Sequence, residues 1–342
     1  MEAIRRMENQ MKAMLINNYG QKRLQMENVP IPEISSNDVL VEIHAASINP
    51  IDFKIRDGKL RPLLKYSMPL ILGNDFSGTV IETGKDVMYF KPGDPVYGRP
   101  RKSRIGTFAE YISVHKDDIA IKPKNLTFEE AASVPLVGLT CYQAFQDKLS
   151  LKPNDKILIQ AGSGGIGTFA IQLAKEMGAF VATTTSNAGK DLVQSLGADK
   201  IINYREEKFE EKLADYDYVY DTLGGDTLIN SFKILKPGGK IVSISGVPNA
   251  HFAEENNDPF WKKIIFKLIS MKLTKLEKQS NVQYIFLFMK PSGVQLNKIR
   301  ELIEAEKIRP MIDRIFSFED TQKAMEYSES GKAKGKIVIQ IK

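Results

Sequence analysis

Cysteine is nearly absent from this chain of 342 residues, which contains a single one, Cys141. One cysteine cannot form an internal disulfide, and it excludes a metal site built from several thiolates. This composition is typical of proteins in a reducing compartment, and we predict a cytoplasmic location. Cys141 lies in an apolar stretch, so we interpret it as a small buried hydrophobic residue and not as a nucleophile.

Long apolar runs and dense basic clusters are also lacking. No apolar run reaches the roughly 18 residues of a membrane-spanning helix, so no membrane partner is predicted. Residues 1–10 are charged, lack the apolar core of a secretory signal, and are interpreted as an N-terminal extension. The 48 basic residues exceed the 42 acidic ones, but they are scattered and not interleaved with aromatic residues. Single-stranded nucleic-acid binding is therefore a minor alternative, and no specific nucleic acid is expected as a partner.

The chain does contain a glycine motif of the form G-x-G-x-x-G. It follows the apolar run Ile157–Ile159 and precedes the helix-like run Phe169–Ala174. Glycines at these places allow a tight turn, close approach of the backbone to a pyrophosphate, and close packing of helix on strand. The free amides at the helix start can then bind phosphate groups. The motif predicts dinucleotide binding, with a purely structural turn as the alternative, and comprises Gly162, Ser163, Gly164, Gly165, Ile166 and Gly167.

Two patterns of secondary structure divide the chain. Short β-type segments punctuated by glycines fill the first third and indicate a β-rich barrel, whereas strands and helices alternate from Asp155 onward. Such alternation predicts a parallel sheet with right-handed crossovers. Between the two regions, Thr127 is expected to cap a helix whose third residue is Glu130. The predicted strands are 180–185, 200–204, 216–221 and 239–245 in the sheet, then 283–289 at an interface or in the core, and 335–340 in the barrel.

The order of four segments resembles that of the medium-chain dehydrogenase/reductase superfamily: Met11–Ala13, Gly73–Gly78, Ala161–Gly167 and Leu196–Asp199. Within it, the chain is most similar to the zinc-free quinone oxidoreductase and enone reductase branch. The resemblance implies an α/β fold and a homodimer formed through the last strand of the parallel sheet. It also implies a GroES-like catalytic domain from residues 11–130 and 307–342, and a Rossmann domain with a doubly wound parallel sheet, which binds NADPH, from residues 131–306.

Zinc-dependent members of this superfamily carry cysteine and histidine ligands at set places. Where those enzymes have Gly-His-Glu, this chain has Gly73, Asn74 and Asp75, and the region of Asn49 stands where they have an early cysteine ligand. Its three histidines are far apart in the sequence. The usual nitrogen and sulfur ligands of zinc are therefore missing, and no metal site is predicted.

The sequence predicts a preference for NADPH over NADH. Rossmann sites that prefer NAD place an acid about 20 residues after the glycine motif, where it binds the adenosine ribose. Here the second strand ends around Thr184 and Ser186, without an acid. Hydroxyl groups can donate to a 2′-phosphate, and Lys190 can balance its charge. The family resemblance adds Tyr204 as a contact of this phosphate. A surface lysine and an ordinary strand-end tyrosine are the alternatives.

The segment Asn49–Lys54 resembles the N-P-x-D-x-K signature of enone and quinone reductases, whose residues border the nicotinamide in a cleft between the domains. The resemblance implies that Asn49 orients the ring or donates to a substrate carbonyl, and that Asp52 orients its neighbours. It implies that Lys54 stabilises developing oxyanion charge or contacts the cofactor. An Asn-Pro turn that begins a helix, with Lys54 exposed, is the alternative. Tyr66, in a loop that can cover the substrate, is a further candidate or an ordinary loop aromatic.

Further cofactor contacts are implied by the resemblance alone. They come from a helix near the nicotinamide end and from the loops after the fourth and fifth strands of the sheet. Helix packing and ordinary turns are the alternatives. The segment 250–280, with Trp261 and many lysines, is helical in pattern and is interpreted as a surface insertion, or else as an interfacial or lid helix. The implied contacts are Thr140, Leu223, Ser245 and Gly246.

Together these features predict a zinc-independent oxidoreductase that transfers a hydride from NADPH to a quinone or to the β-carbon of an α,β-unsaturated carbonyl. Without zinc, the acceptor must be polarised by hydrogen-bond donors, which favours acceptors already activated by conjugation. A non-catalytic NADPH-binding sensor and a zinc-free enzyme of alcohol dehydrogenase type are the alternatives.

Overall fold

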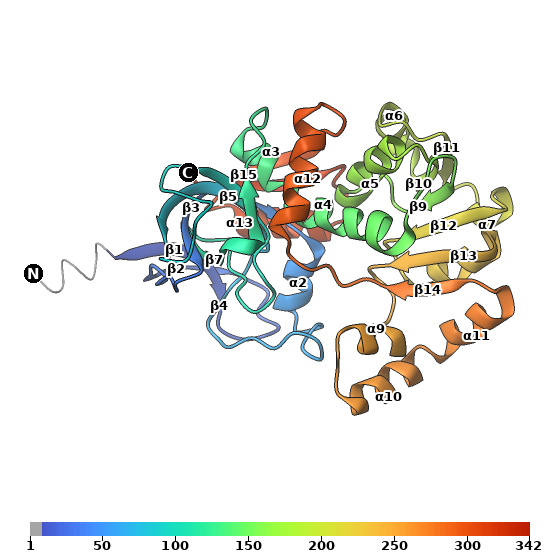
Figure 1. Ribbon diagram of the computed structural model, residues 1–342, viewed down its shortest axis with the longest axis horizontal. Coiled ribbons are helices and arrows are strands. Elements are labelled where there is room, and N and C mark those ends of the chain that lie inside the picture. Colours follow the sequence, from blue (N-terminus) through green and yellow to red (C-terminus); the bar gives the residue numbers. More distant parts are fainter. Residues whose placement is uncertain (1–8) are drawn as a thin grey trace, which may run out of the picture. The chain divides into compact units, whose positions relative to one another are not determined.

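The structure, a computed structural model, describes residues 9–342 (Figure 1). The chain forms two compact units, one that runs up to Leu139 and resumes over Lys290–Lys342, and one that comprises Thr140–Met289. Most of the predicted N-terminal extension lies outside the described residues, and Gln10 already belongs to the first strand. The boundaries predicted at residues 130 and 306 differ from both divisions between the units. None of the helices between residues 9 and 342 has the length and apolar character that a membrane crossing requires.

The first unit is built on a seven-stranded sheet to which both ends of the chain contribute. The C-terminal strand β16 (Lys336–Gln340) pairs antiparallel with β3 (Asp38–Ile48), so the two predicted β-rich regions share one GroES-like domain. Val39, Val41 and Ile43 alternate along β3 and bury their side chains in the core. The sheet has the order β15 (Ile312–Ser317), β16, β3, β5 (Asp75–Thr83), β6 (Pro95–Gly98) and β8 (Ile119–Ile121), with β7 (Tyr111–His115) beside β3. A three-stranded sheet has the order β2 (Gln25–Pro30), β1 (Gln10–Ile16) and β4 (Leu70–Ile71).

Helix α3 (Phe128–Ala132) of this unit begins as the sequence predicts. The Thr127 hydroxyl accepts the backbone N–H of Glu130 at 3.2 Å, and the Glu130 carboxylate accepts the Thr127 N–H at 2.8 Å. This capping box satisfies two amides that the helix itself cannot. From residue 9 onward, the unit also contains the helices α2 (Pro50–Arg56), α12 (Gly293–Glu304) and α13 (Thr321–Glu329) and the 3₁₀ turn Lys116–Asp118.

The second unit contains the predicted parallel sheet, with six strands. Its first strand, β9, lies between the second and fourth strands, which is the order of doubly wound dinucleotide-binding sheets. Leu158, Val219 and Ile241 on three neighbouring strands are fully buried. The order is β11 (Lys200–Asn203), β10 (Phe180–Thr185), β9 (Lys156–Ile159), β12 (Tyr216–Asp221), β13 (Leu235–Ser243) and β14 (Gln283–Phe286).

Helices connect these strands, and the predicted helical segment 250–280 forms three of them. Helix α4 (Pro135–Tyr142) spans the junction between the two units and continues as a π-helix over Gln143–Leu149. The remaining helices are α5 (Gly165–Glu176), α6 (Lys190–Ser195), α7 (Phe209–Lys212), α8 (Gly225–Ser231), α9 (Ala250–Glu255), α10 (Phe260–Ile269) and α11 (Met271–Ser280), with 3₁₀ turns at Asn187–Gly189 and Phe232–Ile234.

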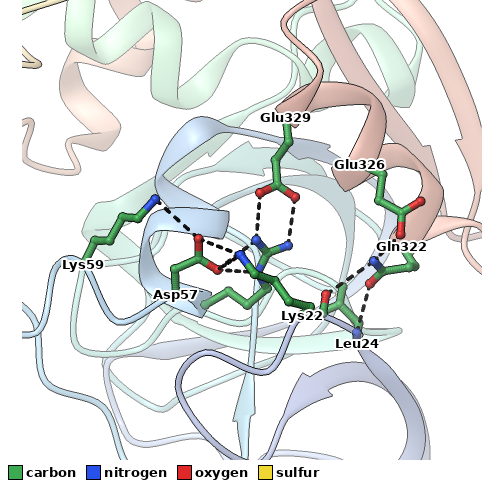
Figure 2. A network of polar contacts seen from close by, with 8 residues as sticks. Lys22, Leu24, Asp57, Lys59, Gln322, Glu326 and Glu329 are labelled. Carbon is green, nitrogen blue, oxygen red and sulfur yellow. Dashed lines mark hydrogen bonds and ion pairs between the residues drawn. The ribbon is translucent and has the colours of Figure 1, made fainter.

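A buried guanidinium links α2 to the C-terminal helix α13. Arg56 is 1% exposed and donates to both carboxylate oxygens of Glu329, at 3.0 and 2.8 Å, and to Asp57 at 2.9 Å. Figure 2 shows Lys22 and Lys59 reaching the same Asp57 carboxylate from the outside. The two-pronged geometry is the strongest form of arginine–carboxylate pairing. The guanidinium of Arg56 therefore joins α2, in the first part of the chain, to α13 near its C-terminus.

We expect Arg56→Met to lower the free energy of unfolding by about 2–4 kcal/mol, because it leaves the Glu329 carboxylate without its cation and the Asp57 carboxylate with the two lysines alone. Urea unfolding followed by circular dichroism measures this loss. The matched control is Lys59→Met, since Lys59 is exposed and contacts Asp57 at 3.5 Å. It should cost less than about 1 kcal/mol. Equal losses in the two variants would contradict the role given to Arg56.

Candidate active site

The glycine motif forms the turn between β9 and α5. A Cβ at Gly162 would collide with the Thr183 side chain, and one at Gly167 would collide with the Ala161 carbonyl, so these glycines let strand and helix pack closely. Gly164 is the N-cap, and a Cβ there would meet only the Ala161 oxygen, at 3.3 Å. These features agree with the three roles that glycine has in a dinucleotide-binding turn.

The start of α5 presents backbone donors. Thr168 is the first residue whose N–H closes a helical bond, to the Gly164 carbonyl at 3.0 Å. The amides of Gly165, Ile166 and Gly167 precede it and have no acceptor within the helix. Aligned amides with the positive end of the helix dipole suit an anion. The turn therefore fits the pyrophosphate of a dinucleotide.

Strand β10 supports this turn through two hydroxyl groups. Thr184 is buried, and its hydroxyl accepts the Ala161 N–H at 3.0 Å. Thr185 donates to the Ser163 hydroxyl at 3.0 Å. Thr184, expected at the 2′-phosphate, thus uses its hydroxyl to hold the turn. Ser163 is positioned from the side by a residue that sequence reasoning did not select.

The other residues expected at the 2′-phosphate gather after β10 and β11. Ser186 caps the 3₁₀ turn, and Lys190 is exposed at the start of α6. Tyr204 is 59% exposed, and its backbone N–H donates to the Thr185 carbonyl at 3.2 Å. The backbone of Tyr204 therefore lies beside the end of β10.

An acidic residue also reaches this region. The Glu206 carboxylate accepts a hydrogen bond from the Asn187 side chain at 3.1 Å, and Asn187 in turn accepts one from Asn203 at 3.0 Å. Sequence reasoning missed Glu206 because it follows β11, whereas an NAD-type acid is sought directly after the second strand. Its contact with Asn187 depends on the pairing of β10 with β11.

Asp221 ties together the loops after β12 and β13. Its carboxylate accepts the N–H groups of Leu223 at 3.2 Å and Gly224 at 2.9 Å, and the Ser243 hydroxyl donates to its other oxygen. Ser243 also accepts the Gly246 N–H at 2.8 Å. Burial raises the pKa of Asp221, against the effect of these bonds. Sequence reasoning selected Leu223, and Ser245 and Gly246 of the second loop, but missed the Asp221–Ser243 pair that holds them.

The remaining candidate of this unit lies on α4. Thr140 is buried, and the neighbouring Cys141 thiol lies 3.7 Å from the Ile166 carbonyl at the start of α5. Burial raises the pKa of the Cys141 thiol far above its usual range, so the thiol stays protonated at neutral pH. Cys141 is thus the buried, inert residue that the sequence predicts.

In the first unit, Asn49 lies at the centre of a buried polar network. It is the N-cap of α2, with Pro50 in the first turn, and its side chain is 1% exposed. The side-chain amide donates to Asp75 at 2.8 Å and to the Ser47 carbonyl at 3.3 Å. Lys336 donates to its oxygen. Both N–H groups of Asn49 are therefore engaged, and donation to a substrate carbonyl would require one bond to break.

Lys336 was not selected from the sequence, yet it is the cation of this network. It lies on β16, is 5% exposed, and donates to the Ile48 carbonyl at 3.2 Å as well as to Asn49 and, at 3.4 Å, to Asp75. Its three N–H groups thus have three acceptors. Burial lowers the pKa of Lys336, while Asp75 and Asp52 oppose this change. No sequence signal pointed to Lys336, because the pairing of β16 with β3 brings it there.

Asp52 links the network to a second buried cation. Its carboxylate accepts the Asn49 backbone N–H and the Asn74 side chain, each at 2.7 Å. Asn74 accepts a hydrogen bond from Arg99 at 3.3 Å, and Arg99 also donates to the Pro100 carbonyl at 2.8 Å. Desolvation raises the pKa of Asp52 to about 7. Asp52 thus accepts hydrogen bonds from both Asn49 and Asn74 and joins them in one network.

Lys54 and Tyr66 are candidate residues whose side-chain groups do not belong to the Asn49 network. Lys54 lies on α2 and is half-buried, which lowers the pKa of its ammonium. The Tyr66 hydroxyl is buried and has no hydrogen-bond partner within residues 9–342. Burial raises the pKa of Tyr66 to about 12, so it remains a proton donor at neutral pH. Across the same described residues, no three His, Cys, Asp or Glu side chains gather as metal ligands would.

Asp52 makes stability depend on pH. Its pKa is about 7 in the folded chain and about 4 in an unfolded one. Between these values the folded state retains a proton that the unfolded state has lost, so the free energy of unfolding should fall as pH rises from about 4 to 7. The Asp52→Asn variant has no carboxyl group at this position that could bind or release this proton. We expect wild type to lose up to about 4 kcal/mol more than the variant over that interval in urea unfolding. Parallel pH profiles would contradict the assignment.

Comparisons with known proteins agree with these features. Residues 35–124 match the family described as "Alcohol dehydrogenase GroES-like domain", and residues 196–339 match "Zinc-binding dehydrogenase". The "NAD(P)H oxidoreductase RTN4IP1, mitochondrial" of Danio rerio is 35% identical over 97% of this chain and 91% of its own length. The "2-methylene-furan-3-one reductase" of Solanum lycopersicum is 35% identical over 97% and 79%.

A solved structure extends this similarity to the whole fold. The quinone oxidoreductase from Coxiella burnetii superposes with a TM-score of 0.83 at 35% identity, over 97% of this chain and 100% of that one. The strand order of the parallel sheet, the glycine turn and the GroES-like domain to which both ends of the chain contribute are thus accompanied by sequence identity along nearly the entire chain. The chain therefore belongs to the medium-chain dehydrogenase/reductase superfamily, in its branch of quinone oxidoreductases and alkenal/one oxidoreductases.

Proposed function

We propose that the chain is an NADPH-dependent oxidoreductase that reduces quinones or α,β-unsaturated carbonyls without zinc. The observation that carries this proposal is the glycine turn between β9 and α5, with its row of amides, on a sheet of dinucleotide-binding order. Relatives named "NADPH-dependent alkenal/one oxidoreductase, chloroplastic" and "Quinone-oxidoreductase QR1, chloroplastic" support the choice of acceptor. When bound, NADPH supplies the hydride.

The protein's part is to bind, orient and polarise. The α5 amides hold the pyrophosphate, and the loops tied by Asp221 border the same carboxyl edge of the sheet. The Asn49 network keeps α2 in place, and Lys54 projects from that helix. We assign to Lys54 the stabilisation of negative charge that develops on the acceptor oxygen, with Tyr66 as a second donor. Reduction of a conjugated acceptor needs no stronger electrophile.

The proposal predicts that purified protein oxidises NADPH in the presence of a panel of quinones and enones, followed at 340 nm. Lys54→Met should lower kcat/KM about 10²-fold, because it removes one donor to the developing oxyanion. The matched variant Lys59→Met, which changes an exposed lysine just beyond the end of α2, should retain activity. A chelator should leave the rate unchanged.

No turnover with any acceptor, together with normal NADPH binding, would instead support a non-catalytic sensor. Loss of activity on chelation would contradict zinc independence. Turnover of simple alcohols in place of conjugated acceptors would favour the enzyme of alcohol dehydrogenase type. Equal losses in Lys54→Met and Lys59→Met would remove Lys54 from the reaction.

The preference for NADPH is argued from charge around the end of β10. Lys190 and Tyr204 lie after β10 and β11 and can contact a 2′-phosphate, which a hydroxyl or ammonium group stabilises. Glu206 opposes this preference, because its carboxylate repels a phosphate. Since Glu206 is already engaged by Asn187, we assign the larger effect to the cation.

We expect Lys190→Gln to weaken NADPH binding about tenfold and to leave NADH binding nearly unchanged, because only NADPH carries the 2′-phosphate. Fluorescence titration of both cofactors measures the two dissociation constants. Lys208→Gln is the matched control, since this exposed lysine pairs with Glu211 at 3.2 Å. Tighter binding of NADH than of NADPH by the unmodified chain would overturn the assignment.

A further inference from the structure

Helix α10 exposes an unusually apolar surface. Large hydrophobic side chains normally pack inward, and a contiguous exposed group of them marks a binding surface. Phe260 is 76% exposed, Trp261 57% and Leu268 61%. We define the α10 face as the exposed hydrophobic residues of this helix together with the first residue of α11: Phe260, Trp261, Ile264, Ile265, Leu268, Ile269 and Met271.

The α10 face is not the side by which the helix packs on its own unit. Phe266 is buried and lies 6.2 Å from the ring of Phe252, which in turn contacts Phe286 of β14 at 5.0 Å. Lys262 pairs with Asp258 at 2.9 Å on the packed side. Figure 1 shows α9, α10 and α11 together beside the β14 edge of the sheet. The helix is therefore anchored by one side and presents the α10 face outward.

Positive charge surrounds the α10 face. Residues 260–276 contain five lysines and no acidic residue. Lys267, Lys272 and Lys275 are exposed, and Lys263 is partly exposed. Lysine side chains of this length can keep the ammonium group in water while their methylene groups lie against an apolar phase. The basic residues, scattered over the chain as a whole, are thus dense at this one surface.

We propose that α10 is an interfacial helix that docks the chain on an anionic lipid bilayer. The α10 face would insert among the upper acyl chains, and the lysines would meet the phosphates of the headgroups. A helix of ten residues lies in the plane of the interface and does not cross it. Aromatic residues such as Trp261 prefer this depth.

A second copy of the chain fits this surface less well. Two α10 faces in contact would bring together four lysines from each copy, since the fifth, Lys262, already pairs with Asp258 on the packed side. Residues 260–276 offer no carboxylate to neutralise these four. An anionic bilayer matches both properties at once, because it offers an apolar layer beneath a negatively charged one.

Trp261 makes the test direct, since it is the single tryptophan of the chain and lies on the α10 face. Full-length protein is titrated with vesicles of phosphatidylcholine, with or without 30% phosphatidylglycerol. We expect a blue shift of the tryptophan emission and quenching by lipids brominated on their acyl chains. Co-sedimentation should be at least tenfold stronger with the anionic vesicles and should weaken in 0.5 M salt.

Paired variants distinguish insertion of the α10 face into the bilayer from non-specific hydrophobic adsorption. Ile264→Gln with Leu268→Gln should abolish the emission shift and lower vesicle binding at least tenfold, and Lys263→Gln with Lys267→Gln should remove the preference for anionic lipid. The matched control is Val294→Gln, which changes a hydrophobic residue that is more exposed than Ile264 and Leu268 and lies on α12 of the other unit. Because all these side chains reach solvent, thermal unfolding should be unchanged in each variant.

Two results would overturn the proposal. One is the absence of an emission shift with either kind of vesicle. The other is a dimer in light scattering that the Ile264→Gln, Leu268→Gln variant dissociates, with no binding to vesicles, which would make the α10 face a contact between copies. Neither outcome depends on cofactor preference or on turnover.

Discussion

The buried ammonium group of Lys336 is the interaction on which the arrangement of the first unit depends. A lysine with 5% exposure persists only where every donor has an acceptor, and here Ile48, Asn49 and Asp75 provide them. Because Lys336 comes from the last strand and its acceptors come from the first third of the chain, the network also holds the two ends of the chain together. It positions the start of α2, and with it Lys54.

The second unit also depends on a buried charged group whose hydrogen bonds are satisfied, but here the group is a carboxylate and not an ammonium. Asp221 is buried and accepts from two backbone amides and a serine hydroxyl, so the loops after β12 and β13 hold each other in place. Thr184 and Thr185 do the same for the glycine turn from the neighbouring strand. The candidate cofactor residues are therefore supported by buried polar side chains that do not themselves reach the surface.

Helix α10 is organised differently, because it leaves large apolar side chains exposed to solvent. Its sequence has the composition of an ordinary amphipathic helix, and an inward apolar side would be the usual expectation. Phe266 is the buried residue of α10, and its ring packs against Phe252 of α9, which in turn contacts Phe286 of β14. The exposure of so many apolar residues on α10 thus results from the way the helix packs on its unit. The periodicity of its sequence cannot reveal this packing.

The glycine turn, the cap at Thr127 and the alternation of strands and helices were determined by sequence alone, because each depends on residues close together in the chain. The order of the strands in the parallel sheet came from the tertiary structure. The chain's membership of its superfamily was likewise readable from short motifs. Lys336, Arg99, Asp221 and Glu206 were not, since strand pairing and loop contacts bring them to their sites from distant positions. The family resemblance gave Asn49 the role of orienting the nicotinamide ring or donating to a substrate carbonyl, whereas the tertiary structure engages both of its side-chain N–H groups. Local geometry follows from local residues, but the partner of a buried polar group is decided by the fold, because burial requires that group to be satisfied wherever its partner lies in the chain.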